Sequence, residues 1–232
     1  MNMNFEEFSQ PIGDHKELNP KIWEPNQRLK SSARGALMRI AEDFIKFVNV
    51  PMDVKDVVIT GGNANYTYTD ASDIDLHIVI DYDQVECDRA VHELMDSKRL
   101  LYREYRDITV HDIPVELYVE DSARPAVSRG CYSIVTDEWI KQPTSPPPYD
   151  EDAVKSKVSM WETIINHAVK TKDLSTARTA MKLIKDYRTL GLRTPEGEFS
   201  VPNLTYKSLR NGNKIRALQQ QIDIAHDRDL SI

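Results

Sequence analysis

Hydrophobic positions along the chain predict one helix, then strands and helices in alternation, and finally helices alone. Apolar residues between Ser32 and Pro51 recur every three or four positions, which places them on one face of a helix. The run "DVVITGG" is β-branched and ends at glycines, and "DIDLHIVID" alternates polar and apolar residues, so both predict strands. The stretch "QVECDRAVHELMDSKRLLY" predicts a second helix, and "ITVHDIPVELYVED" predicts a third strand.

A proline-rich segment, "PTSPPPYDEDA", marks the boundary to a second region, because prolines interrupt helices and central strands. Beyond it, apolar positions at helical spacing predict helices over 154–168 and 175–190 and over 204–221, the last interrupted at "NGN". The first thirty residues contain three prolines and no sustained period. The sequence therefore predicts an extended arm over 1–30, an α+β core with a mixed sheet over 31–143, and an all-helical region over 144–232.

Composition favours a soluble protein. The chain has 232 residues, 40% of them hydrophobic, and no apolar run near the ~20 residues that a membrane helix needs. Its start lacks the basic flank and apolar stretch of a signal peptide, so we expect a cytoplasmic protein without membrane partners. Cys87 and Cys131 have no spacing typical of a disulfide framework or a zinc site, and are expected to be reduced and inert.

The net charge of -7 argues against wholesale coating of nucleic acid, which requires Lys and Arg. One segment departs from this average. Between Phe199 and Ile222 there is no acidic residue, and four basic residues stand there: Lys207, Arg210, Lys214 and Arg216. This basic segment over 207–216 is expected to line the mouth of a site, to contact phosphate or nucleic acid, or to form a solvated helix face.

Two aspartates stand in one of the most apolar segments of the chain. Side chains alternate along a strand, so Asp73, Asp75 and His77 face one side, while Ile74 and its apolar neighbours face the other. Two carboxylates held this close repel each other unless cations or protons neutralise them. Magnesium prefers such oxygen ligands. His77 shares this face, where it can touch a nucleotide, act as a base or make structural hydrogen bonds.

A third carboxylate is expected on an adjacent strand. The segment "IPVELYVED" offers Glu116 and, on the same face, Tyr118 and Glu120. Glu116 is preferred because its apolar neighbours would face the core as those of Asp73 and Asp75 do. Three acids predict two bound magnesium ions, with Mn²⁺ as a substitute, which stabilise the attacking and leaving oxygens of a phosphoryl transfer.

A glycine pair precedes the aspartates. Gly61 and Gly62 end the first predicted strand, where the absence of side chains lets backbone N–H groups approach a triphosphate. Asn63 offers a further hydrogen-bond donor. We therefore expect a phosphate-binding turn beside the metal ligands.

Together, Gly61-Gly62, a ten-residue gap and Ser72-Asp73-Ile74-Asp75-Leu76 resemble the signature of the nucleotidyltransferase superfamily typified by DNA polymerase beta. The resemblance covers about residues 34–121. It implies that Asp73, Asp75 and Glu116 are catalytic and bind magnesium, and that Gly61, Gly62, Asn63 and Ser72 bind the nucleotide. It further implies that a nucleoside monophosphate passes from a triphosphate such as ATP to a hydroxyl or phosphate of an RNA, protein or small-molecule acceptor.

The chain departs from the family pattern in two places. Gly62 stands where many members have serine, and "NANYTY" carries no cation where the minimal enzymes have arginine. Lys55, Lys98, Arg99 or the basic segment can supply that charge. The helical region is expected to close the other side of the nucleotide cleft.

Further stretches, including "LNPKIWEP" and "GCYSIVTDEWI", resemble nucleotidyltransferase-like proteins of tailed bacteriophages, which would place the protein in the host cytoplasm. Two other readings stay open. One is a catalytically inactive member of the superfamily that serves as an accessory, regulatory or virion protein. The other is a nucleic-acid-binding or antitoxin-like partner, which would use the basic segment.

Overall fold

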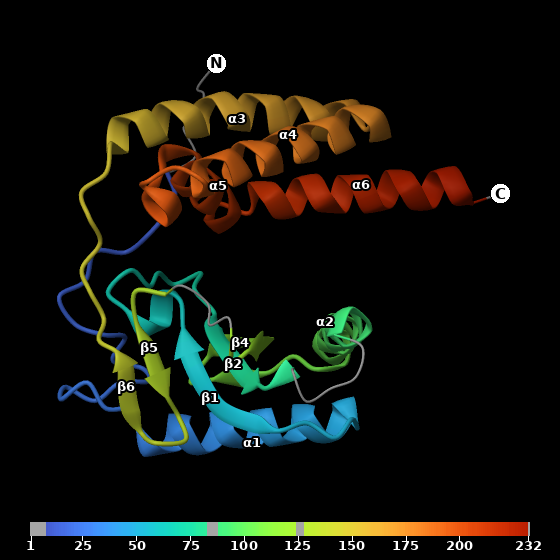
Figure 1. The fold of residues 1–232 in the computed structure, drawn as a ribbon. Coiled ribbons are helices and arrows are strands. Elements are labelled where there is room, and N and C mark those ends of the chain that lie inside the picture. Colours follow the sequence, from blue (N-terminus) through green and yellow to red (C-terminus); the bar gives the residue numbers. More distant parts are fainter. Residues whose placement is uncertain (1–7, 83–87, 124–127, 232) are drawn as a thin grey trace. The chain divides into compact units, whose positions relative to one another are not determined.

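The structure is a computed structural model that describes residues 8–82, 88–123 and 128–231. The chain divides into two units, one formed by residues 13–145 and the other by residues 8–12 and 146–231 (Figure 1). The predicted arm over 1–30 is therefore not a separate element where it is described. Residues 13–30 belong to the first unit, whose core contains Ile22 and Trp23. Cys87 lies outside the described residues.

The first unit is built on a mixed six-stranded sheet with the strand order β3-β4-β2-β1-β5-β6 (Figure 1). β2 lies at its centre, antiparallel to β1 and parallel to β4. The sequence predicted β1 and β2, and its third predicted strand covers β3 and β4, which a turn at His111 and Asp112 separates. The bounds are β1 Val54–Thr60, β2 Ile74–Ile80, β3 Thr109–Val110, β4 Ile113–Asp121, β5 Cys131–Ser133 and β6 Glu138–Lys141.

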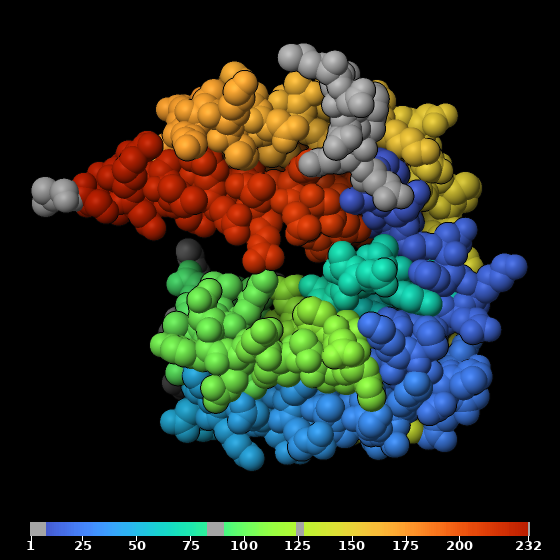
Figure 2. Space-filling model, turned by 180° about the vertical axis from the view of Figure 1, so that it is seen from behind, coloured from blue at the N-terminus to red at the C-terminus, as the bar shows by residue number. Residues whose placement is uncertain are grey.

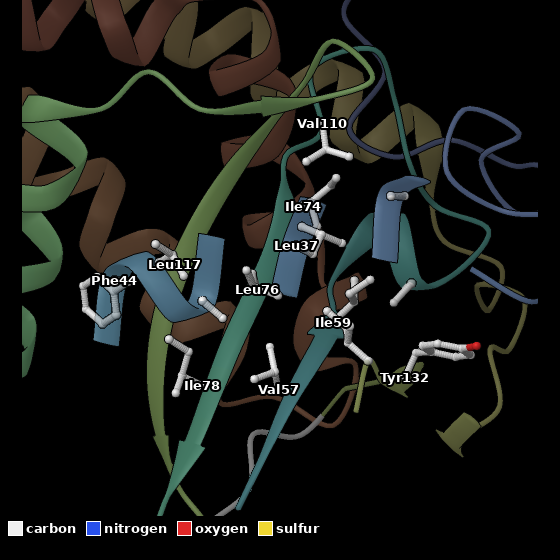
Figure 3. Packing of buried hydrophobic residues seen from close by; sticks show 14 of the residues in the cluster. Leu37, Phe44, Val57, Ile59, Ile74, Leu76, Ile78, Val110, Leu117 and Tyr132 are labelled. Atoms are coloured by element: carbon white, nitrogen blue, oxygen red, sulfur yellow. The ribbon is translucent and has the colours of Figure 1, made fainter. Parts of the chain in front are cut away.

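The alternating pattern of β2 decides which face of the sheet is buried. Every second residue is fully buried, namely Ile74, Leu76, Ile78 and Ile80, while the residues between them, Val79 included, are partly exposed. The buried side chains pack with those of β1 and β4 against helix α1, Ser31–Val48, through residues such as Leu37 and Phe44 (Figure 3). The opposite face of the central strands carries most of their polar residues, together with Val58 and Val79.

Helix α2, Asp88–Tyr105, connects β2 to β4. A parallel pair of strands needs such a crossover, because its chain must return to the same end of the sheet. Tyr102 anchors α2 to α1: its ring packs against Phe44 and Phe47, and its O–H donates a hydrogen bond to Asp43 Oδ2 at 2.8 Å. These contacts therefore fix α2 against α1.

The second unit is helical. Its helices are α3 Glu151–Thr171, α4 Leu174–Leu192, α5 Val201–Asn211 and α6 Lys214–Leu230. Asp150 and Asp173 cap α3 and α4, each carboxylate accepting a backbone N–H of the first turn. The predicted break at "NGN" is confirmed, since Asn213 adopts φ 59° between α5 and α6. The chain is thus an α+β protein with C-terminal helices.

Among the described residues, no helix combines the length and the apolar character needed to span a membrane.

Candidate metal centre

The structure brings together the three carboxylates that the sequence singled out. Asp73 directly precedes β2, Asp75 lies within it, and Glu116 lies on β4. The parallel pairing of these strands sets Asp75 opposite Glu116. Each of the three residues offers one oxygen atom, and these oxygens all lie within 4.8 Å of one another. All three residues are partly exposed, so a cation from solvent can reach them.

The donor set suits a hard divalent cation. Three carboxylates on a rigid sheet provide oxygen ligands and leave further coordination positions for water or phosphate oxygens, an arrangement typical of magnesium. The backbone beside them is shaped for close approach, because Gly61 has φ +72° and lies against the carboxylate of Asp75. The residues present therefore fit a magnesium site.

Two arginines of α2 neutralise part of this negative charge. Arg103 Nη1 donates to Glu116 Oε1 at 3.1 Å, and Arg99 Nη1 lies 3.7 Å from the same oxygen. The Glu116 side chain is 23% exposed, so these pairs are only partly screened by water. Glu116 thus lies between two acids on one side and two guanidinium groups on the other.

His77 makes hydrogen bonds on both sides of its ring. Its Nδ1 lies 2.7 Å from Glu120 Oε2, and its Nε2 lies 3.0 Å from Thr60 Oγ1. Of the readings open for His77, these contacts favour the structural one. They also occupy Glu120, the other acid on this face of β4.

Tyr118 separates the two groups of acids. Its ring stacks on His77, and burial, together with the negative charges of Asp75 and Glu116, raises the pKa of its phenol well above the usual value. Tyr118 therefore stays protonated and neutral beside the carboxylates.

Asn63 is buried and tethers the glycine turn to the aspartates. Its Nδ2 donates to the backbone oxygen of Asp73 at 2.8 Å, and its Oδ1 accepts a hydrogen bond from Asn19 Nδ2 at 2.8 Å. Its backbone oxygen accepts a hydrogen bond from Trp23 Nε1 at 2.6 Å. Because the residue has no exposed surface, its side chain faces the interior instead of a bound nucleotide. Its observed role is to hold Asp73 in place.

Ser72 closes a turn in front of β2. Its hydroxyl oxygen accepts a hydrogen bond from the backbone N–H of Thr69 at 2.9 Å. Gly62 faces this turn, since a Cβ built on Gly62 would lie 3.4 Å from Ser72 Oγ. The predicted nucleotide-binding residues Gly61, Gly62 and Ser72 thus lie together next to the carboxylates.

Among the cations proposed to replace the missing arginine, Arg99 contacts Glu116 of the carboxylate cluster. Lys55 pairs with Asp53 at 2.5 Å and with Asp81 at 3.7 Å, and Lys98 lies over the ring of Phe47. Sequence reasoning missed Arg103, although its spacing of four residues from Arg99 places both on one face of a helix.

The basic segment over 207–216 is split between two helices. Lys207 and Arg210 lie on α5, and Lys214 and Arg216 lie on the first turn of α6. Arg210 and Arg216 are exposed, whereas Lys214 Nζ lies 3.9 Å from Glu162 Oε1 in the helical unit. A solvated helix face accounts for the two exposed arginines.

Comparisons of the chain with protein-family models, with curated proteins and with solved structures find no match. The residues of the site are therefore the basis for assigning a function. Their most informative feature is the convergence of Asp73, Asp75 and Glu116 next to the glycine turn.

Proposed function

We propose that this protein is a magnesium-dependent nucleotidyltransferase, which moves a nucleoside monophosphate from a nucleoside triphosphate to an acceptor hydroxyl or phosphate. One observation carries the proposal: Asp73, Asp75 and Glu116 present oxygens within 4.8 Å of one another on neighbouring parallel strands. The glycine turn beside them supports it, as does the resemblance of these residues to the nucleotidyltransferase signature. In this proposal the mixed sheet with α1 and α2 is a nucleotidyltransferase core.

The reaction is an in-line displacement at the α-phosphorus of the triphosphate. An acceptor oxygen forms a bond to this phosphorus while the bond to the oxygen of the leaving pyrophosphate breaks, and the electron pair leaves with pyrophosphate. The acceptor proton passes to Glu116 or to water. Bound magnesium, or Mn²⁺ in its place, supplies charge neutralisation for the phosphate oxygens.

The residues of the chain hold the cation and the acceptor in position for this reaction. Asp73 and Asp75 hold the cation at a fixed place because β2 is clamped by its buried face to α1. Asn63 fixes the backbone at Asp73, and Gly61 leaves room for the carboxylate of Asp75. Glu116 has the further task of orienting the acceptor.

The test is calorimetric titration of each of the four common nucleoside triphosphates, with and without magnesium, into the wild-type protein and the Asp73→Asn/Asp75→Asn variant. We expect one or more nucleotides to bind to the wild type only with magnesium, and the double variant to lose this binding. Asp70→Asn is the matched control, because Asp70 is an exposed aspartate in the same connection between β1 and β2. Equal binding to the wild type and the double variant would refute the metal site.

A second candidate function is that of an inactive member of the superfamily. The ion pairs of Glu116 Oε1 with Arg99 and Arg103 favour it, because they already neutralise part of the negative charge that would attract a metal. In that case magnesium would not strengthen nucleotide binding, and no pyrophosphate would be released with any acceptor. The same titration, followed by a pyrophosphate-release assay, separates the two functions.

A further inference from the structure

A hollow lies between helix α2 and strand β4, directly behind Glu116. Three arginines from one face of α2 and its end line it, and among the described lining residues Glu116 is their acidic counterpart. The rest of the lining consists of Tyr102 and of the apolar residues Ile40, Ile108, Val115 and Leu117.

Two of the arginines pack against tyrosine rings. Arg99 stacks over the ring of Tyr118 at 5.1 Å, and Arg106 lies 5.9 Å from the ring of Tyr102. The Nε of Arg99 is buried and has no hydrogen-bond partner among the described residues, although Asp96 Oδ1 lies 3.7 Å away. A buried donor without an acceptor is costly, so Arg99 gains from any acceptor that reaches this N–H group.

The surface around α2 is accessible. Figure 2 shows α2, in green, on the outside of the sheet unit next to α1, in blue. The Arg103 side chain is 70% exposed, and Arg106 is exposed as well. Guanidinium groups bind phosphate through two parallel N–H donors, which makes such a cluster a phosphate-binding surface.

The order of the strands indicates whether the three arginines lie on the side of the leaving oxygen or on the side of the attacking oxygen. Thr60, Asp75 and Glu116 are paired across β1, β2 and β4, and Gly61 follows Thr60. The glycine turn therefore flanks the carboxylates on one side, and the arginines flank them on the other. An in-line displacement needs its leaving and attacking oxygens on opposite sides of the phosphorus.

We infer that the arginine hollow binds a phosphate group of the acceptor, so that the acceptor of this enzyme is a phosphorylated molecule. The inference rests on the proposed function. If the triphosphate lies over Gly61 and Gly62, its pyrophosphate leaves on that side, and the acceptor approaches over Glu116. Its hydroxyl then meets Glu116 while its phosphate pairs with Arg99 and Arg103.

Glu116 couples the two sites. In the structure its carboxylate pairs with both arginines, and binding of a cation by the three acids would draw it toward the metal. The arginines would then be released for an anion. The hollow is therefore expected to bind phosphate more tightly once Glu116 is engaged elsewhere or is replaced by a neutral residue.

The experiment is a titration of inorganic phosphate into the full chain at low salt, with binding measured by calorimetry or ³¹P NMR. Arg99→Gln and Arg103→Gln should each weaken binding by roughly tenfold or more, the order expected for a charge-assisted hydrogen bond. Arg39→Gln, at an exposed arginine of α1 outside the hollow, should bind phosphate as the wild type does. Glu116→Gln should bind it several-fold more tightly, a gain that general loss of structure cannot produce.

Equal loss in Arg39→Gln, or no loss in either α2 variant, would overturn the inference. Repeating the titration with saturating magnesium and α,β-methylene ATP tests whether the hollow binds the acceptor or the nucleotide. If phosphate and the nucleotide analogue bind together, the hollow is an acceptor site. If they compete, the arginines hold the phosphates of the nucleotide, and the assignment to the acceptor fails.

The same titrations separate this inference from the proposed function. Phosphate binding that depends on Arg99 and Arg103, without any nucleotide binding, would refute the nucleotidyltransferase and leave the anion site. Nucleotide binding that depends on Asp73 and Asp75, without phosphate binding, would refute only the inference that the hollow binds phosphate. A sugar phosphate and a 5′-phosphorylated oligonucleotide, compared as probes, identify the source of the phosphate, because the oligonucleotide alone should show a steep dependence on salt.

Discussion

The backbone of Gly61 lies so close to Asp75 that a Cβ built on Gly61 would be 1.7 Å from Asp75 Oδ2. The same glycine has φ +72°, a conformation that other residues rarely adopt. The carboxylate of Asp75 therefore occupies the volume that a side chain at position 61 would fill. Gly61 is required by the candidate metal ligand itself, in addition to any role in phosphate binding.

Gly61→Ala is expected to destabilise the fold by about 2–4 kcal/mol, from left-handed backbone strain and from displacement of Asp75. It should also weaken magnesium binding. Gly62→Ala is the matched control: its Cβ would meet atoms of Ser72 and Tyr68 at 3.4 Å or more, which is ordinary contact. Urea unfolding and Mn²⁺ titration followed by EPR measure both effects. Similar losses in the two variants would contradict this account.

Asn63→Ala should cost about 1–3 kcal/mol of unfolding free energy, because it leaves the Asp73 carbonyl and the Asn19 amide without their buried partner. The aspartates should also lose part of their affinity for magnesium. Asn26→Ala, at an exposed asparagine of the same unit, should cost clearly less. Chemical denaturation of both variants provides the comparison, and a loss for Asn63→Ala no larger than the control would exclude the tethering role.

Alkaline pH should loosen the contact between α1 and α2. Burial and the hydrogen bond to Asp43 raise the pKa of Tyr102 from 10.0 to about 12. Because the folded state prefers the neutral phenol, its contribution is complete below pH 10 and is lost as the pH rises toward 12. Unfolding curves of the wild type and Tyr102→Phe should therefore converge over this range. Curves that stay parallel would show that Tyr102 does not titrate as expected.

Cys131 should react slowly with alkylating reagents. Burial, with the nearby charges of Glu120 and Asp56, raises the pKa of its thiol from 9.0 to about 11. At pH 8 the reactive thiolate is then less abundant by on the order of 100-fold. Iodoacetamide labelling of the Cys87→Ser variant, folded and in urea, measures this difference. Equal rates in the two states would mean that Cys131 is not protected.

The carboxylate site was accessible to sequence reasoning because it depends on local alternation. The period of two along β2 places Asp73 and Asp75 on one face, and the same pattern at Val115 and Leu117 identified Glu116. The register in which β2 and β4 pair then places Glu116 beside Asp75. The long helices α1, α3 and α4 were predictable for a similar reason, since each carries a continuous apolar face.

The short strands were not predictable. β3, β5 and β6 have two to four residues each, too few to show a period. They exist because neighbouring strands offer them hydrogen bonds, as β4 does for β3 and β1 does for β5. Strand pairing of this kind joins residues distant in the sequence, and one sequence alone does not reveal it.

The sequence by itself determined the α+β class, the long helices and the residues of the acidic cluster, because these follow from periodicity over short stretches of chain. Only the tertiary structure decided that Asn63 is a buried tether and that Arg99 and Arg103 meet Glu116. It also assigned residues 8–12 to the helical unit, where Ser9 accepts a hydrogen bond from Ser208. Each of these depends on burial and on contacts between segments far apart along the chain, which the local pattern does not encode.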